Sequence, residues 1–325
     1  MFGALLAFAS AAFFGMNNAA ARRGVLKGTV LQGLAITVPI GIPLFVPFVL
    51  AMGGFAAMAN WKLDTWLWMT LAGVVHFVIG RYGNYRTTQA LGATLSTPIQ
   101  QMSILVALLL AFVFLDETVN AVNVLGILLV VFGPMVVVRR RKAASAAALA
   151  KGFEPQYGQG FFWGLVSALG YGSSPLLIAF GLGTAGGFDN GVAGVFVSYL
   201  AATVVVLAMV AAVGGRGYLA GLDRTSAYWF LLSAVLVAIS QLFRYLALAI
   251  APVTVVVPIQ RLSVVFRILF NALINRDHEA LDVWVLFSIL LAVVGAVALS
   301  VDTVTLLGAL AVPDWLAEWL VRPLI

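Results

Sequence analysis

The hexapeptide PIQQMS at residues 98–103 returns as PIQRLS at residues 258–263, which is 160 positions further along the chain. A second pair of matching segments, SAAFFG (10–15) and SALGYG (167–172), occurs in the same order with an offset of 157. Matching blocks in a conserved order indicate an internal duplication. The two related halves are predicted at residues 1–138 and 158–301.

The composition places the chain in a membrane. Hydrophobic residues make up 63% of the 325 residues and charged residues only 9%, with a mean hydropathy of +1.08. Soluble domains are about 25% charged, so this chain lacks the polar side chains that a water-exposed surface needs. A membrane-spanning helix needs about 20 predominantly apolar residues. The ten segments that meet this requirement are roughly 2–21, 29–50, 66–86, 94–114, 121–138, 160–180, 190–213, 227–249, 254–274 and 283–301.

Five spans in each half is an odd number, so the second half must enter the membrane from the opposite side to the first. Inverted repeats of this kind are typical of transporters, in which two bundles rock around a site near the membrane midplane. The predicted fold is therefore an all-α integral membrane protein, with ten transmembrane helices as two inverted five-helix repeats around a central cavity. Pro39, Pro43 and Pro47 are expected to bend or break the second span.

Two segments lie outside the predicted repeats. Residues 139–157 form a basic, polar linker between the halves. Residues 302–325 form a C-terminal tail in which Trp315 and Trp319 are one helical turn apart. Aromatic and acidic residues in this arrangement favour a short amphipathic helix at the membrane interface.

The residue counts exclude several kinds of chemistry. The chain has no cysteine, and two histidines are too few for a histidine-based metal cluster. We therefore predict no metal, no cofactor and no catalytic residue. The formal net charge is +6, but the basic residues lie in short loops or apolar runs, which argues against nucleic acid as a partner. The expected partners are the lipid bilayer and a small-molecule solute, with the chain acting as a monomer or a homodimer.

Charged residues are distributed unevenly. Eleven of the eighteen lysines and arginines fall in the odd-numbered loops, so the positive-inside rule predicts that these loops are cytoplasmic and that both termini lie outside. The acidic residues lie in loops or at the ends of spans. A charge at the bilayer centre costs about 2.5–3.5 kcal/mol on insertion scales, so it usually faces a cavity or a partner, unless it snorkels to the interface. The arginines within or at the edge of spans are Arg81, Arg86, Arg244, Arg261 and Arg267.

Polar residues share faces on several predicted helices. Gln260, Ser263 and Arg267 follow helical spacing in the ninth span, and such a stripe faces the bundle interior or a water-filled cavity. Hydrogen bonding between helices is the alternative role for each single Ser or Asn. Guanidinium groups bind carboxylate or phosphate, which favours an anionic solute. The predicted substrate-binding residues are Asn17, His76, Arg81, Asn84, Tyr85, Gln100, Ser103, Tyr171, Ser174, Gln241, Arg244, Tyr245, Gln260, Ser263 and Arg267.

Three stretches resemble a known family. The run ALGATLSTPIQQMSILVALLLAFVFLDETVNAVNVLGILLVVFG (90–133) is similar to the second part of an EamA repeat, RYLALAIAPVTVVVPIQRLSVVFRILFNALI (244–274) is similar to its second copy, and residues 4–25 resemble the first helix. This resemblance to the drug/metabolite transporter superfamily covers about residues 1–301. It implies a ten-helix basket whose cavity is lined by spans one, three, four, six, eight and nine.

The resemblance leaves the solute and the orientation open. Members of the superfamily move amino acids, sugars, nucleotide sugars, drugs or other metabolites. They are usually drawn with both termini in the cytoplasm, opposite to the charge distribution here. The small multidrug resistance branch couples protons through a glutamate in the first helix, where this chain has Phe14, Asn17 and Asn18. That departure argues against proton-coupled export of a cation.

The sequence favours a non-enzymatic secondary transporter in the inner membrane that moves a small polar metabolite with carboxylate or phosphate groups. A drug or amino-acid exporter of the same family is the first alternative. An integral membrane transferase is an alternative of another class, with Asp116, Glu117 and Glu279 as candidate acids or bases. A structural subunit without a transported solute is a third.

Overall fold

The computed structural model describes residues 1–25, 27–140, 156–183, 186–274 and 301–324, together with a few positions between 287 and 299. Its regular elements are helices, apart from one isolated bridge between Asn120 and Pro323. Within these described ranges, six helices are long and apolar enough to span a bilayer, which confirms an all-helical membrane protein. They are Phe2–Gly24, Val30–Ala51, Leu63–Leu91, Tyr157–Leu182, Phe188–Ala212 and Arg224–Leu248.

The first half of the chain follows the predicted spans, with local interruptions. The second span breaks after Thr37 and resumes at Gly41, as its three prolines predict. The third span contains a π-helical turn, η1 (Val74–Gly80). The elements are α1 (Phe2–Val25), α2 (Val30–Thr37), α3 (Gly41–Ala51), α4 (Gly54–Ala59), α5 (Leu63–Gly73), η1, α6 (Arg81–Phe114) and α7 (Ala121–Arg140).

The second half is also built of helices in its described residues. The predicted ninth span is interrupted, because α13 ends at Gln260 and α14 begins at Ser263. Most of the predicted tenth span, together with Glu279 and most of the basic linker, lies outside the described residues. The elements are α9 (Tyr157–Leu182), α10 (Phe188–Ala212), α11 (Gly215–Ala220), α12 (Arg224–Leu248), α13 (Val253–Gln260), α14 (Ser263–Ile274), α16 (Thr303–Ala309) and α17 (Asp314–Val321).

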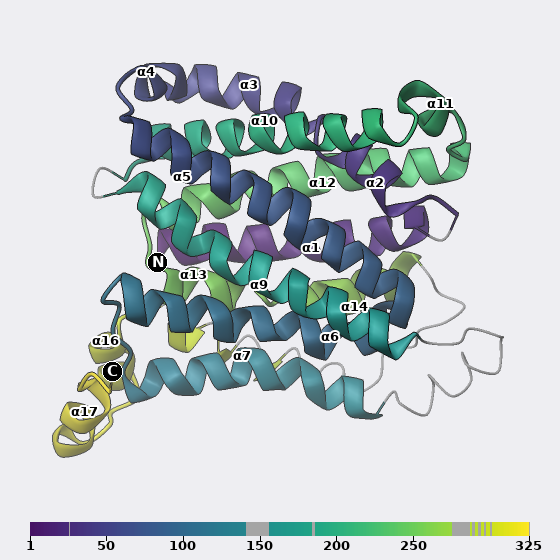
Figure 1. Cartoon of the computed structure of the whole chain (residues 1–325). Coiled ribbons are helices and arrows are strands. Elements are labelled where there is room, and N and C mark those ends of the chain that lie inside the picture. The colour runs from purple at the N-terminus through teal and green to yellow at the C-terminus, as the bar shows by residue number, and fades with distance from the viewer. Residues whose placement is uncertain are drawn as a thin grey trace.

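Helix α6 reverses direction along its length, so its two limbs run along α9 in opposite directions. In its first limb, Gly83 lies against the backbone of Trp163 and Ser167, and Leu91 lies against Gly160. In its second limb, Ile99 packs on Gly164 and Val106 packs on Gly172. Residue numbers along α9 therefore fall along the first limb and rise along the second, so the two limbs supply the predicted third and fourth spans (Figure 1).

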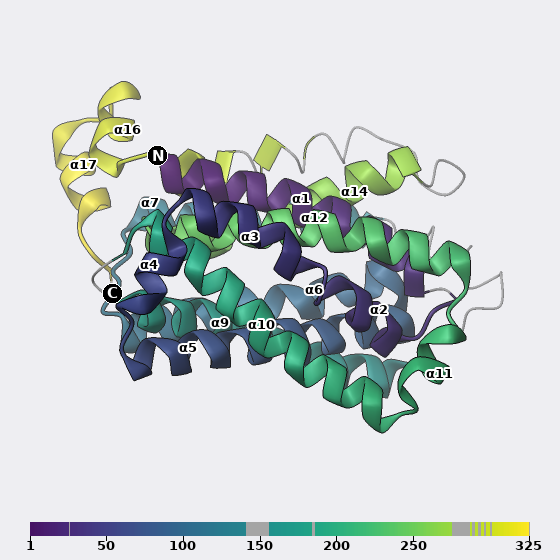
Figure 2. The same ribbon diagram turned by 90° about the horizontal axis from the view of Figure 1, so that it is seen from above.

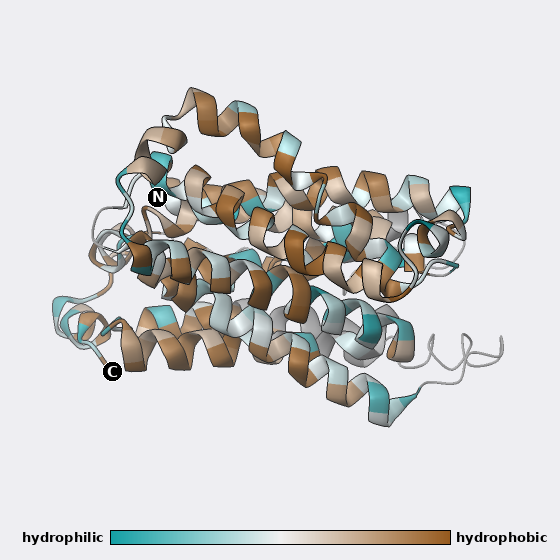
Figure 3. Cartoon of the chain, turned by 45° about the horizontal axis from the view of Figure 1, so that its top comes forward, coloured by the Kyte–Doolittle hydropathy of each residue, from teal (hydrophilic) through white to brown (hydrophobic). Residues whose placement is uncertain are grey.

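The helices lie roughly parallel or antiparallel to one axis. Both termini, α4, α16 and α17 lie at one end of the bundle, and α11 and the end of α7 lie at the other (Figures 1 and 2). Apolar residues run along the helices, with hydrophilic ones more frequent towards the two ends (Figure 3). Leu105, Leu109 and Val204 are more than 60% exposed, which is appropriate for side chains that face lipid.

The C-terminal tail folds into two short helices instead of the single one predicted. The Leu324 N–H donates to the Val119 carbonyl (2.8 Å), and the Asn120 side chain donates to the Thr303 hydroxyl (2.9 Å). These bonds attach the tail to the start of α7. Trp315 is 73% exposed, as expected for an aromatic side chain available to the membrane interface.

Two close contacts relate the halves to each other. Gly15 of α1 lies against the Ser263 carbonyl of α14, and Gly172 of α9 lies against the Ser103 carbonyl of α6. Gly15 and Gly172 correspond in the sequence duplication, as do Ser103 and Ser263. Each half therefore places its glycine against the PIQ-motif serine of the other half.

Candidate solute-binding site

The PIQRLS motif forms a break in the ninth span, where the sequence predicts an unbroken helix over 254–274. The Arg261 N–H is shared between the carbonyls of Val257 (3.2 Å) and Pro258 (3.0 Å), and the turn continues through Leu262. Proline removes a backbone donor and kinks a helix. Irregular backbone at membrane depth is tolerated where it is buried in protein or lines a cavity, so this break points to a site.

A small cavity lies at this break. Its volume of about 10 Å³ leaves room for about one water molecule. It is bounded by α1, η1, α9, α12 and α13, and we call it the Arg244 cavity. Its lining residues are Phe14, His76, Tyr171, Pro175, Gln241, Arg244, Val257, Gln260 and Arg261.

Arg244 is 1% exposed and makes its hydrogen bonds to neutral groups. One terminal nitrogen lies 3.1 Å from His76 Nδ1 and 3.2 Å from Gln241 Oε1. The other donates to the Ser174 hydroxyl at 3.1 Å. Its Nε is buried and has no hydrogen-bond partner in the part of the chain that the structure describes. The guanidinium group therefore keeps an unused donor beside the cavity.

Arg261 contributes a second guanidinium group to the same cavity. Its Nε is also buried and unpaired within the described ranges. No acidic side chain of the described residues lines the Arg244 cavity. Two positive charges and several neutral polar groups therefore surround this space, an arrangement that suits a negatively charged guest.

A second cavity of about 10 Å³ lies between α1, α6 and α14, and we call it the Arg267 cavity. The hydroxyl of Tyr85 is buried there without a hydrogen-bond partner among the described residues. The lining residues are Asn18, Ala21, Arg22, Val25, Asn84, Tyr85, Thr88 and Arg267.

A chain of polar contacts separates the two cavities. Gln100 donates to the Asn84 side-chain oxygen (2.5 Å), and Asn84 donates to the Tyr171 hydroxyl (3.4 Å). The Tyr171 ring in turn lies 4.6 Å from the His76 ring and 6.3 Å from the Phe14 ring, measured between centroids. Because Tyr171 lines one cavity and Asn84 the other, this chain forms the wall between them.

A comparison with known protein families bears on the resemblance seen in the sequence. Residues 1–139 match the model of the EamA-like transporter family. This match agrees with the resemblance drawn from the sequence over the same residues. Together with the six long apolar helices, it indicates a multi-pass membrane protein similar to transporters of the drug/metabolite type.

Known structures support the fold of this chain along nearly its whole length. A crystal structure described only as that of a protein has a TM-score of 0.66 and covers 92% of this chain and 96% of its own, at 15% identity. In total, 28 chains of known structure are similar to it. No curated protein matches the sequence of this transporter.

Eight of the fifteen predicted site residues line the two cavities. His76, Tyr171, Gln241, Arg244 and Gln260 line the Arg244 cavity, and Asn84, Tyr85 and Arg267 line the Arg267 cavity. Six others lie outside both linings and make these contacts: Ser174 and Gln100 through the bonds above, Asn17 with Ser233, Tyr245 with Ser198, Ser103 with the Gln100 carbonyl, and Ser263 against Gly15.

Arg81, the remaining predicted residue, lies apart from both linings. Its guanidinium group donates to the Tyr199 hydroxyl (3.1 Å) and to the Thr37 carbonyl and hydroxyl (both 3.4 Å). It also lies over the Phe77 ring, 5.0 Å from the centroid. These contacts join the break in the second span to the third and seventh spans, which is a packing role.

Sequence reasoning left four lining residues of the Arg244 cavity out of the candidate site: Phe14, Pro175, Val257 and Arg261. Arg261 stood out as an intramembrane arginine, and its position next to the PIQ motif was the available signal. Phe14 and Pro175 gave none, because an apolar residue in an apolar helix has no distinguishing pattern. The same is true of η1, the π-helical turn that carries His76.

Proposed function

We propose that this protein is a secondary transporter that works by alternating access. It moves a small anionic metabolite, one that carries a carboxylate or phosphate group, across the inner membrane. The observation that carries this proposal is Arg244, buried at the broken ninth span with an unpaired Nε and only neutral hydrogen-bond partners.

The energetics of a buried guanidinium group favour an anionic solute. An ionised group inside a membrane protein is expensive to bury, and it is retained where it serves a pathway or a ligand. Arg244 and Arg261 line one cavity, and no carboxylate from the described ranges lines it. An incoming carboxylate or phosphate can accept two parallel N–H bonds from a guanidinium fork, which neutral His, Gln and Ser side chains do not replace.

Alternating access is supported by the way the two halves share the site. Asn84 and Arg244 correspond in the duplication, and each lines a different cavity. The crossed contacts of Gly15 with Ser263 and of Gly172 with Ser103 are those that a two-fold axis in the membrane plane would generate. We therefore propose ten helices in two inverted repeats, in an occluded state with the Arg244 cavity and the Arg267 cavity on opposite sides of the wall.

The same observations weigh against the alternatives. An amino-acid substrate also carries an ammonium group, and in the part of the chain that the structure describes no acidic side chain lines either cavity to receive it. A transferase needs an acid or base that is free to react. The Glu117 carboxylate instead accepts the N–H groups of Val253 (2.8 Å) and Thr254 (2.7 Å), which caps the first turn of α13. One chain supplies the walls of both cavities, so a monomer is sufficient for transport.

Counterflow uptake into proteoliposomes tests the proposal. The purified protein is preloaded with unlabelled mono- and dicarboxylates, phosphate esters, neutral amino acids or lipophilic cations, and uptake of the labelled compound is measured. We expect exchange with carboxylate or phosphate compounds only. A preference for a lipophilic cation would refute the anionic substrate class.

A further inference from the structure

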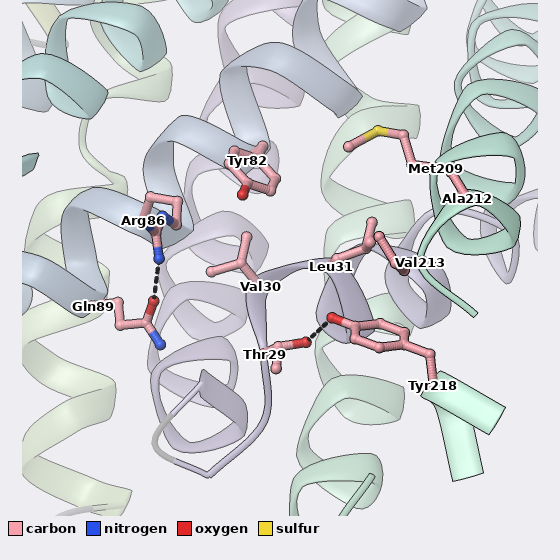
Figure 4. Close-up of a pocket in the computed structure, with 10 residues that line it drawn as sticks. All are labelled: Thr29, Val30, Leu31, Tyr82, Arg86, Gln89, Met209, Ala212, Val213 and Tyr218. Atoms are coloured by element: carbon pink, nitrogen blue, oxygen red, sulfur yellow. Dashed lines mark hydrogen bonds between the residues drawn. The ribbon is translucent and has the colours of Figure 1, made fainter. Parts of the chain in front are cut away.

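One opening in the described part of the molecule is separate from the solute site. It is a groove of about 520 Å³ between α2, the first limb of α6, α10 and α11, at the end of the bundle opposite the termini (Figure 4). It shares no lining residue with the Arg244 cavity or the Arg267 cavity. The lining residues are Thr29, Val30, Leu31, Tyr82, Arg86, Gln89, Met209, Ala212, Val213 and Tyr218.

One side of the groove is apolar. Leu31 of α2 and Met209, Ala212 and Val213 at the end of α10 provide aliphatic walls (Figure 4). Val213 is 51% exposed, so this side is open to the surroundings of the bundle. In a membrane protein those surroundings are lipid chains, and an aliphatic groove that opens to them suits an acyl chain.

The other side of the groove is polar and positively charged. Arg86 donates to Gln89 Oε1 (3.2 Å), and its guanidinium carbon lies 5.9 Å from the Trp163 ring centroid. Its Nε is buried and has no hydrogen-bond partner within the described ranges. The hydroxyls of Thr29 and Tyr218 bond to each other across the mouth. Among the described residues no acidic side chain lines the groove to neutralise Arg86.

The groove lies at the depth where lipid headgroups are expected. Thr29 caps the start of α2, and Val213 directly follows α10, so the polar side lies where these helices leave the membrane. The same end carries Arg22 and Arg23 in the last turn of α1 and Arg216 in α11. Clustered basic residues at a membrane surface attract anionic lipids, by about 1 kcal/mol for each Lys or Arg.

We propose that this groove binds an anionic phospholipid from the leaflet at that end of the bundle. The lipid phosphate lies against Arg86 and the Thr29 and Tyr218 hydroxyls, and one acyl chain lies along Leu31, Met209 and Val213. A free phosphate would leave the aliphatic side in contact with water, and a neutral lipid would leave the Arg86 guanidinium group without a counter-charge. A bound lipid would hold α2 against α10.

Lipid retention by the full-length protein, measured by native mass spectrometry, tests this proposal. The purified protein is mixed with dioleoyl phosphatidylglycerol, dioleoyl phosphatidylcholine or inorganic phosphate at equal concentrations. We expect phosphatidylglycerol to be retained about five-fold more than phosphatidylcholine, as one guanidinium contact implies. Equal retention of the two lipids, or displacement of phosphatidylglycerol by inorganic phosphate at the same concentration, would overturn the proposal.

Four variants locate the binding site. Arg86→Gln should reduce phosphatidylglycerol retention to the phosphatidylcholine level, and Arg86→Lys should keep most of the preference because it keeps the charge. Ala212→Trp, which fills the apolar side, should reduce retention of both lipids. Arg224→Gln is the matched control, because Arg224 is exposed at the same end and outside the groove. A loss of preference in the Arg224 variant, or none in Arg86→Gln, would contradict the site.

Discussion

The rings of Phe14 and Tyr171 meet edge to face, with centroids 6.3 Å apart and an interplanar angle of 82°. The two residues occupy the same position in the duplicated sequence, 157 residues apart. Equivalent residues that touch each other lie close to the axis of any rotation that exchanges the two halves. Both line the Arg244 cavity, and Tyr171 also bonds to Asn84 of the Arg267 cavity. This aromatic pair is therefore well placed to close the path between the two cavities.

Truncating the first ring of this pair should weaken the wall. Edge-to-face aromatic pairs contribute about 0.5–1.5 kcal/mol beyond their burial. We expect Phe14→Ala to allow net efflux from preloaded liposomes without a counter-solute, while the native protein shows mainly exchange. Phe13→Ala is the control, because Phe13 pairs with Phe243 instead. Equal coupling of exchange in Phe14→Ala and in the native protein would show that the pair is not a gate.

Removing the charge of Arg244 should abolish binding of an anionic solute. Hydrogen bonds to charged groups contribute about 1.5–3 kcal/mol each, so Arg244→Gln should lower counterflow by about tenfold or more. Arg244→Lys should recover only part of the activity, because an ammonium group lacks the planar fork that reaches His76 and Ser174 together. Arg216→Gln on the exposed helix α11 removes the same charge elsewhere and should have no effect. Normal uptake by Arg244→Gln would remove the main support for the proposed solute.

Arg81 should contribute to stability more than to solute binding. Arg81→Gln leaves the buried Tyr199 hydroxyl and Thr37 carbonyl without their donor, which costs about 1–3 kcal/mol. We expect a lower midpoint of thermal unfolding in detergent and an unchanged KM for the folded fraction in liposomes. An increase in KM at unchanged thermal stability would indicate that Arg81 takes part in solute binding.

Glu117 should act as a helix cap and not as a catalytic acid or base. Glu117→Gln keeps an oxygen acceptor for the N–H groups of Val253 and Thr254, so it should transport at close to the native rate. Glu117→Ala loses the cap and should lose about 1 kcal/mol of stability. Thermal unfolding and counterflow measured on both variants separate these effects. Inactivity of a well-folded Glu117→Gln protein would favour the transferase alternative.

The two crossed glycine contacts should be equally sensitive to an added methyl group. A Cβ on Gly15 would lie 2.7 Å from the Ser263 carbonyl oxygen, and one on Gly172 would lie 2.8 Å from the Ser103 carbonyl oxygen. Overpacking of this kind costs about 1–3 kcal/mol. We therefore expect Gly15→Ala and Gly172→Ala to lower the thermal midpoint by similar amounts, and Gly217→Ala, which has open space around it, to leave the midpoint unchanged. Unequal losses would argue against matching contacts in the two halves.

The local sequence pattern was sufficient to predict several features of this protein. The low charge and long apolar runs required a membrane environment, because no other solvent tolerates so few polar side chains. The returning PIQ motif predicted an internal duplication, and three prolines identified the break in the second span, because proline acts on its own helix. The buried polar residues were also visible, since a polar side chain is conspicuous in an apolar helix.

Tertiary structure decided which of these polar residues share a space. Arg81 and Arg244 look alike in sequence, yet Arg81 binds Tyr199 from the seventh span, whereas Arg244 lies beside a cavity at the break between α13 and α14. Phe14 and Tyr171 lie on α1 and α9, in opposite halves of the chain, and they meet only because of the way these helices pack. Contacts between residues more than 100 positions apart depend on how the helices pack, and helical periodicity records only which face of a helix is polar, not which helix lies opposite it.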